Sequence, residues 1–160
     1  MTAVEPLAAG HAALEAGRWE EARAAFAAAL AEQETPQALD GMGVALWWLG
    51  ETRASVAHTE RAYAQFRRAG DAVSAAVAAI NLCVTWMSNF DNHAAAGGWL
   101  ARAERVLEEA DPNPLRGWLW LLRGYLEPDP GRAQELLRRA LELARASGDV
   151  DLELCALGDL

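Results

Sequence analysis

Small and apolar residues recur three and four positions apart along nearly the whole chain, which is the period of an α-helix with one buried face. The pattern predicts helices over residues 5–16, 19–32, 36–49, 52–69, 72–90, 92–110, 115–126, 129–147 and from 149 onward. Because none of these segments can bury a core alone, we expect antiparallel pairs at 5–32, 36–69, 72–110 and 115–147, followed by a trailing helix in the same domain.

Turn and cap residues stand at the expected boundaries. Gly17 supplies a positive φ between the first two helices, and Thr35 precedes Pro36 as a helix cap followed by a proline at the first helical position. A glycine stop followed at once by an aspartate cap occurs at 70–71 and again at 148–149. A further break is expected at 111–114.

The spacing of marker residues predicts a repeat. A turn glycine, a small residue, a bulkier residue and an alanine recur after 33 positions, as Gly17, Ala22, Phe26 and Ala29 and then as Gly50, Ser55, Thr59 and Ala62. Later copies keep only Ala96, Leu100 and Ala103, and then Ala133, Leu137 and Ala140. A period of this length is typical of stacked helical hairpins, whose curvature produces a groove for binding.

These residues resemble tetratricopeptide repeats, with the best match at residues 17–30 and a small residue, Gly43, at the corresponding place in the second copy. The resemblance covers nearly the whole chain and implies an all-α, right-handed α-solenoid of about four hairpins plus a trailing helix. It identifies architecture and not activity.

Three segments, 45–50, 66–71 and 98–103, also resemble the helical-repeat region that precedes the DNA-binding domain in actinobacterial LuxR-type transcription regulators. That resemblance implies a regulatory input module and a chain that is a fragment of a longer one. The helix-turn-helix domain of that family has no counterpart in these residues, so DNA binding is not carried over.

Composition narrows the function. A net charge of −9 opposes direct contact with nucleic acid, which requires clustered cations. The N-terminus lacks the pattern of a signal peptide and no apolar run is long enough for a membrane span, so we expect a cytoplasmic protein without membrane contact. Cys83 and Cys155 fall inside predicted helices without a metal-binding spacing and are expected to be two buried thiols.

The repeat register places one face of each first helix in the groove. Its candidates for binding a protein or peptide partner or a small ligand are Trp47, Trp48, Asn81, Thr85, Ser88, Asn89, Trp118 and Tyr125. Aromatic side chains offer contact area and neutral amides offer orientation. Packing between helices is the alternative for the tryptophans, most strongly for Trp19, Trp86 and Trp99. A solvated face is the alternative for the polar stripe from Asn81 to Asn89.

Chemical groups give little support to catalysis. His11, His58 and His93 lie on different hairpins without metal-ligand spacing, and the pairs at 20–21 and 108–109 are typical of surface carboxylates near helix ends. We expect no catalytic residues, no metal and no cofactor. Some of the tetratricopeptide domains that these repeats resemble clamp a peptide carboxylate with Lys and Asn, and the absence of lysine argues against such a clamp in this chain.

Two functions remain. The first is an input segment of a LuxR-type regulator, and the alternative is a standalone adaptor that binds a protein partner or itself. Residues 150–160 keep an apolar face without a polar cap, which predicts either truncation or a homodimer through that end.

Overall fold

A computed structural model describes residues 4–108 and 115–158, and in these residues all regular structure is helical. The helices are α1 (Val4–Glu15), α2 (Trp19–Glu32), α3 (Pro36–Trp48), α4 (Thr52–Ala69), α5 (Ala72–Ser88), α6 (His93–Val106), α7 (Arg116–Leu126), α8 (Pro130–Ser147) and α9 (Val150–Gly158). The prediction of an all-α fold is confirmed.

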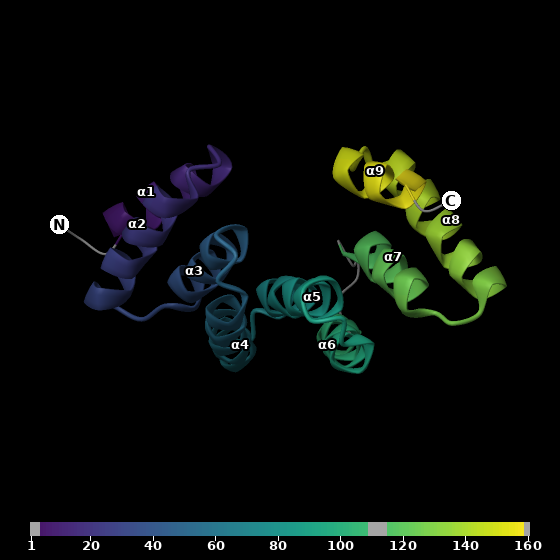
Figure 1. Cartoon of the computed structure of the whole chain (residues 1–160), viewed down its shortest axis with the longest axis horizontal. Helices are drawn as coiled ribbons and strands as arrows, with labels where there is room; N and C mark the ends of the chain where they lie inside the picture. The colour runs from purple at the N-terminus through teal and green to yellow at the C-terminus, as the bar shows by residue number, and fades with distance from the viewer. Residues whose placement is uncertain (1–3, 109–114, 159–160) are drawn as a thin grey trace.

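The helices follow one another along an open arc, with α1 and α2 at one end and α8 and α9 at the other (Figure 1). Each helix packs mainly against its predecessor and its successor in the chain. Helices α3, α5 and α7 lie on the inner side of the arc, and α4, α6 and α8 lie on the outer side. The inner side therefore gathers side chains from three helices that are well separated in sequence.

The predicted turn chemistry is confirmed at the helix ends. Gly17, Gly70 and Gly148 have φ values of 68°, 76° and 74°, the left-handed conformation that glycine adopts without strain. The side chains of Asp71 and Asp149 accept hydrogen bonds from backbone N–H groups three residues later, both at 3.0 Å. Thr35 caps α3 in the same way, with a distance of 3.2 Å to the nitrogen of Ala38. These local signals explain why the predicted boundaries were accurate.

One boundary is wrong by more than two residues. The helix predicted over 92–110 ends at Val106, because the N–H of Leu107 bonds to the carbonyl of Glu104, three residues back, and tightens the last turn. The break predicted at 111–114 lies outside the described residues.

Glycine residues, which have no side chain, allow the first three helices to approach one another closely. The ring of Phe26 on α2 is fully buried and lies against Gly10 of α1 and Gly41 of α3. A Cβ atom at Gly10 would stand 2.6 Å from the ring, and one at Gly41 would overlap it. Phe26, the aromatic marker of the first repeat copy, thus packs against a glycine on each of the two neighbouring helices.

Polar markers in the second copy are also core residues. Ser55 and Thr59 are each 4% exposed. The Ser55 hydroxyl donates to the carbonyl of Gly43 at 2.7 Å, and the Thr59 hydroxyl donates to the carbonyl of Ser55 at 3.0 Å. Because both hydroxyls are hydrogen-bonded, they are buried without a large desolvation cost. Their presence weakens the repeat pattern in the sequence without weakening the packing of α3 on α4.

The expectation of two buried thiols is half wrong. Cys83 is buried in α5, whereas Cys155 is exposed, because it lies on α9 at the end of the arc where fewer helices cover the surface. Neither forms a disulfide. Among residues 4–108 and 115–158, no helix is both long enough and apolar enough to cross a membrane.

Candidate functional site

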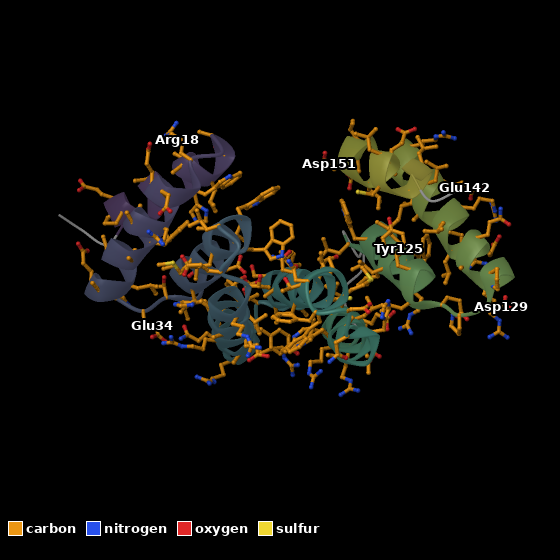
Figure 2. All side chains as sticks on the ribbon, in the orientation of Figure 1. Arg18, Glu34, Tyr125, Asp129, Glu142 and Asp151 are labelled. Carbon is orange, nitrogen blue, oxygen red and sulfur yellow. The ribbon has the colours of Figure 1, made fainter. Side chains whose placement is uncertain are left out.

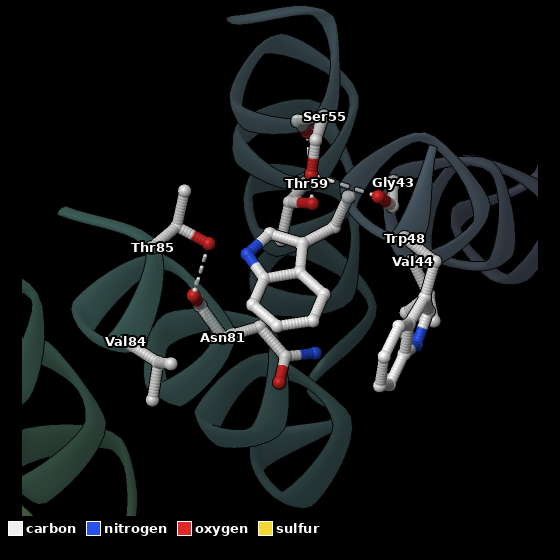
Figure 3. A pocket seen from close by; sticks show the side chains of 9 residues that line it. Gly43, Val44, Trp48, Ser55, Thr59, Asn81, Val84 and Thr85 are labelled. Atoms are coloured by element: carbon white, nitrogen blue, oxygen red, sulfur yellow. Dashed lines mark hydrogen bonds between the residues drawn. The ribbon is translucent and has the colours of Figure 1, made fainter. Parts of the chain in front are cut away.

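A first cavity of about 190 Å³ opens between α3, α4 and α5. Side chains from all three helices surround it (Figure 3). Its lining is mainly apolar, with hydroxyl and amide groups at a few positions, and consists of Gly43, Val44, Trp47, Trp48, Ser55, Thr59, Asn81, Val84 and Thr85. This composition is common for small-ligand sites.

A second cavity of about 440 Å³ lies between α5 and α7. Figure 2 shows Tyr125 of α7 on the inner side of the arc. The cavity is lined by Val77, Ile80, Asn81, Val84, Met87, Ser88, Leu115, Trp118, Leu121, Leu122, Tyr125 and Cys155. Asn81 and Val84 belong to both linings, so the two cavities meet at these side chains, and together they are called the inner-face groove.

The structure brings seven of the eight candidate residues into this groove. Trp47, Trp48, Asn81 and Thr85 line the first cavity, and Asn81, Ser88, Trp118 and Tyr125 line the second. Asn89 lines neither. It ends α5 and accepts a hydrogen bond from the indole N–H of Trp47 at 3.1 Å.

The two adjacent tryptophans have different surroundings. Trp48 is 53% exposed and stacks on Trp19 of α2, with ring centroids 4.7 Å apart and planes 6° from parallel. Trp47 stands nearly perpendicular to Trp48, at 89° and 5.0 Å. Trp19, whose expected role was packing, therefore supports one wall of the first cavity from behind.

The polar stripe on α5 is not a uniform face. Thr85 is 5% exposed, and its hydroxyl donates to the carbonyl of Asn81 at 2.8 Å. Ser88 is exposed, and Asn89 is engaged by Trp47. The side-chain amide of Asn81 is half-buried and has no hydrogen-bond partner among the described residues. Of the four, Asn81 alone presents an unused donor and acceptor to both cavities.

Two hydrogen bonds connect the wall of the second cavity to the end of the arc. The indole N–H of Trp118 donates to the Asp149 carboxylate at 3.1 Å, and the Tyr125 hydroxyl donates to the carbonyl of Cys155 at 3.4 Å. Both aromatic rings are thereby oriented by α9 and its cap. Asp149 thus has two roles, since it also caps α9.

Asp40 is a functional candidate that the sequence analysis did not include in the site. It precedes Val44 by four residues and Trp47 by seven, and therefore shares their face of α3. Its Oδ1 atom is buried without a hydrogen-bond partner, and burial raises the pKa of the carboxyl to about 6. The available signal was that Asp40 is the single charged residue of α3.

Other ionisable groups do not assemble into a reaction centre in the described part of the chain. Among those residues, no three His, Cys, Asp or Glu side chains gather closely enough to hold a metal ion. Glu20 and Glu21 pair with Arg23 and Arg18 on the surface of α2. The His58 ring contacts the carbonyl of Ala54 on its own helix at 2.9 Å.

Compared with known proteins, the chain matches no family model and no curated protein sequence.

Proposed function

We propose that this chain is a non-catalytic recognition scaffold of the tetratricopeptide type, a right-handed solenoid of about four hairpins and a trailing helix, whose inner-face groove binds a ligand. The packing of each helix on its chain neighbours and the burial of the repeat markers support this architecture.

The observation that carries the proposal is the position of Asn81. Its unpaired amide lies where the two cavities meet, with Trp47 and Trp48 on one side and Trp118 and Tyr125 on the other. A mainly apolar groove with one convergent polar group is suited to holding a molecule in a defined orientation. Nothing in the packing of α5 uses the Asn81 amide.

The resemblance of three segments to LuxR-type regulators supports a role as a cytoplasmic input module. A ligand in the groove would touch α3, α5 and α7 together and would favour one curvature of the arc over others. That preference would shift the conformational equilibrium of an output domain attached elsewhere in the polypeptide. The size of the shift is set by the difference in the ligand's affinity for the two curvatures.

A binding screen tests the groove. Small organic molecules and short peptides would be screened by amide NMR, and the affinity of any hit measured for Trp48→Ala and Asn81→Ala. Each variant should weaken binding about tenfold, since each removes a contact of roughly 1 to 2 kcal/mol. Arg132→Ala on the exposed start of α8 serves as the control. Unchanged affinity in both groove variants would place the site elsewhere.

The intact mass of the gene product in its source cells tests the regulatory role. A product much larger than 17.2 kDa, with a basic DNA-binding domain, is expected for the input module. A product of 17.2 kDa would overturn that role and favour the adaptor.

The second candidate function, an adaptor that binds a partner or itself, is favoured by the surface of α9. Val150, Leu154 and Leu157 are 64%, 64% and 46% exposed, and their spacing places them on one side of the helix. An apolar stripe of this kind is suited to packing against another helix.

A further inference from the structure

We propose that the first cavity takes a small organic cation, a molecule that carries an alkylammonium or quaternary ammonium group. This inference rests on the proposed function of the groove and specifies the chemistry of its ligand.

The distribution of charge is the first observation. Of the three inner helices, α3 and α5 contain no arginine, whereas α7 carries Arg116 and Arg123. The lining of the first cavity contains no acidic or basic side chain, and Asp40 is the single charged residue of α3 and α5. Most of the other arginines lie on α4, α6 and α8, which form the outer side of the arc. The part of the inner face formed by α3 and α5 thus favours a cation over a phosphate or carboxylate ligand.

The walls of the first cavity are the second observation. Trp47 and Trp48 both line it, and their rings are nearly perpendicular. The negative face of an indole attracts ammonium groups more strongly than the faces of the other aromatic side chains do. Stacking on Trp19 and the hydrogen bond to Asn89 hold both rings in place before a ligand arrives. Little ordering is then required on binding.

Asp40 supplies the third observation. It lies on the α3 face that carries Val44 and Trp47, and its buried Oδ1 has no partner among the described residues. Asp40 precedes the lining residue Val44 by one helical turn and does not itself line the cavity, so its carboxylate would act on a bound cation through its charge and not as a direct ligand. The two arginines closest in sequence to lining residues face elsewhere: Arg53 borders a separate surface depression beside Phe90, and Arg61 forms an ion pair with Glu34. The cavity volume of about 190 Å³ fits a small molecule.

Choline and its neutral isostere 3,3-dimethylbutan-1-ol are probes of equal shape and different charge. Each would be titrated into the native chain at constant ionic strength while the indole N–H resonances of Trp47 and Trp48 are followed by NMR. Choline should bind at least about tenfold more tightly than the alcohol. Trp48→Leu and Asp40→Asn should each reduce that preference. Asp151→Asn, which removes the same charge from the exposed surface of α9, should leave it unchanged.

Each alternative outcome overturns the inference in a distinguishable way. Equal affinity for the two probes would leave the groove in place and remove the preference for a cation. If Asp40→Asn and Asp151→Asn lower the preference for choline equally, the preference comes from the net charge of the chain and not from the cavity. If neither probe shifts the indole resonances, the cation class is wrong, whereas the groove itself is judged separately by the binding screen.

Discussion

The indole N–H of Trp47 donates a hydrogen bond to the side-chain oxygen of Asn89, 42 residues further along the chain, and so joins α3 to the end of α5. These helices are not sequential neighbours, and α4 lies between them in the chain. The bond holds Trp47 at the edge of the first cavity and resists separation of the two helices that form it.

The energy of this bond can be isolated with a double-mutant cycle. Trp47→Phe and Asn89→Ala should each destabilise the chain, and the double variant should show a coupling of about 0.5 to 1.5 kcal/mol, the net value of a typical hydrogen bond. Urea unfolding followed by circular dichroism measures all four proteins. Trp48→Phe, combined with Asn89→Ala, is the control and should be additive. A coupling near zero would show that the bond contributes nothing to the contact between α3 and α5.

Gly43→Ala should destabilise the chain by about 1 to 3 kcal/mol, because the new methyl group would overlap the hydroxyl of Thr59. Gly97→Ala on α6 is the matched control: a Cβ there meets nothing within 4 Å, so it should stabilise the helix by about 0.5 to 1 kcal/mol. Thermal unfolding compares the two. Thr59→Ala in the Gly43→Ala background should restore part of the loss, and failure to do so would place the strain elsewhere.

Asp40 should make stability fall as pH rises. Its pKa is about 6 in the folded chain against 3.8 for an unperturbed aspartate, so between these pH values the folded state binds more protons than the unfolded state. Relative to Asp40→Asn, the native chain should lose up to about 3 kcal/mol between pH 4 and pH 7. Urea unfolding of both proteins across this range gives the difference. Parallel curves would mean that Asp40 titrates normally.

The two cysteines should react at very different rates. Cys155 is exposed, whereas Cys83 is buried and its pKa is raised to about 11, mainly by desolvation. A thiol-reactive disulfide reagent should therefore label one thiol rapidly at pH 8 and the other only after urea is added. Cys155→Ser should abolish the fast phase. If that variant instead lost the slow phase, Cys83 would be the fast-reacting thiol and Cys155 the slow one.

The apolar stripe of α9 should drive association of the chain. Light scattering after size exclusion should show an average mass that rises with concentration, and Leu154→Glu should return the mass to that of a monomer. Val73→Glu, at another exposed apolar residue, on α5, is the control. A monomer at every concentration would exclude a homodimer through this surface.

Much of the fold could be predicted from residues that act locally. Gly17, Thr35, Asp71 and Gly148 specify turns and caps by their own conformational preferences, so they locate helix ends without any tertiary contact. The spacing of Ala22, Phe26 and Ala29 identifies a buried helix face, and those residues are buried. The end of α6 escaped prediction because it depends on a tightened last turn that no capping residue announces.

For this chain, the sequence by itself determined the helices, their order and the inner-face position of seven of the eight candidate residues, because helical periodicity fixes which side chains share a face. Only the tertiary structure decided what each does. It turned Asn89 into a partner for Trp47, used Trp19 to support Trp48, and left the amide of Asn81 and the carboxylate of Asp40 without partners. Such pairings depend on how helices distant in sequence pack together. The periodicity of one helix shows which of its side chains are buried, but it does not specify which residues of other helices they contact.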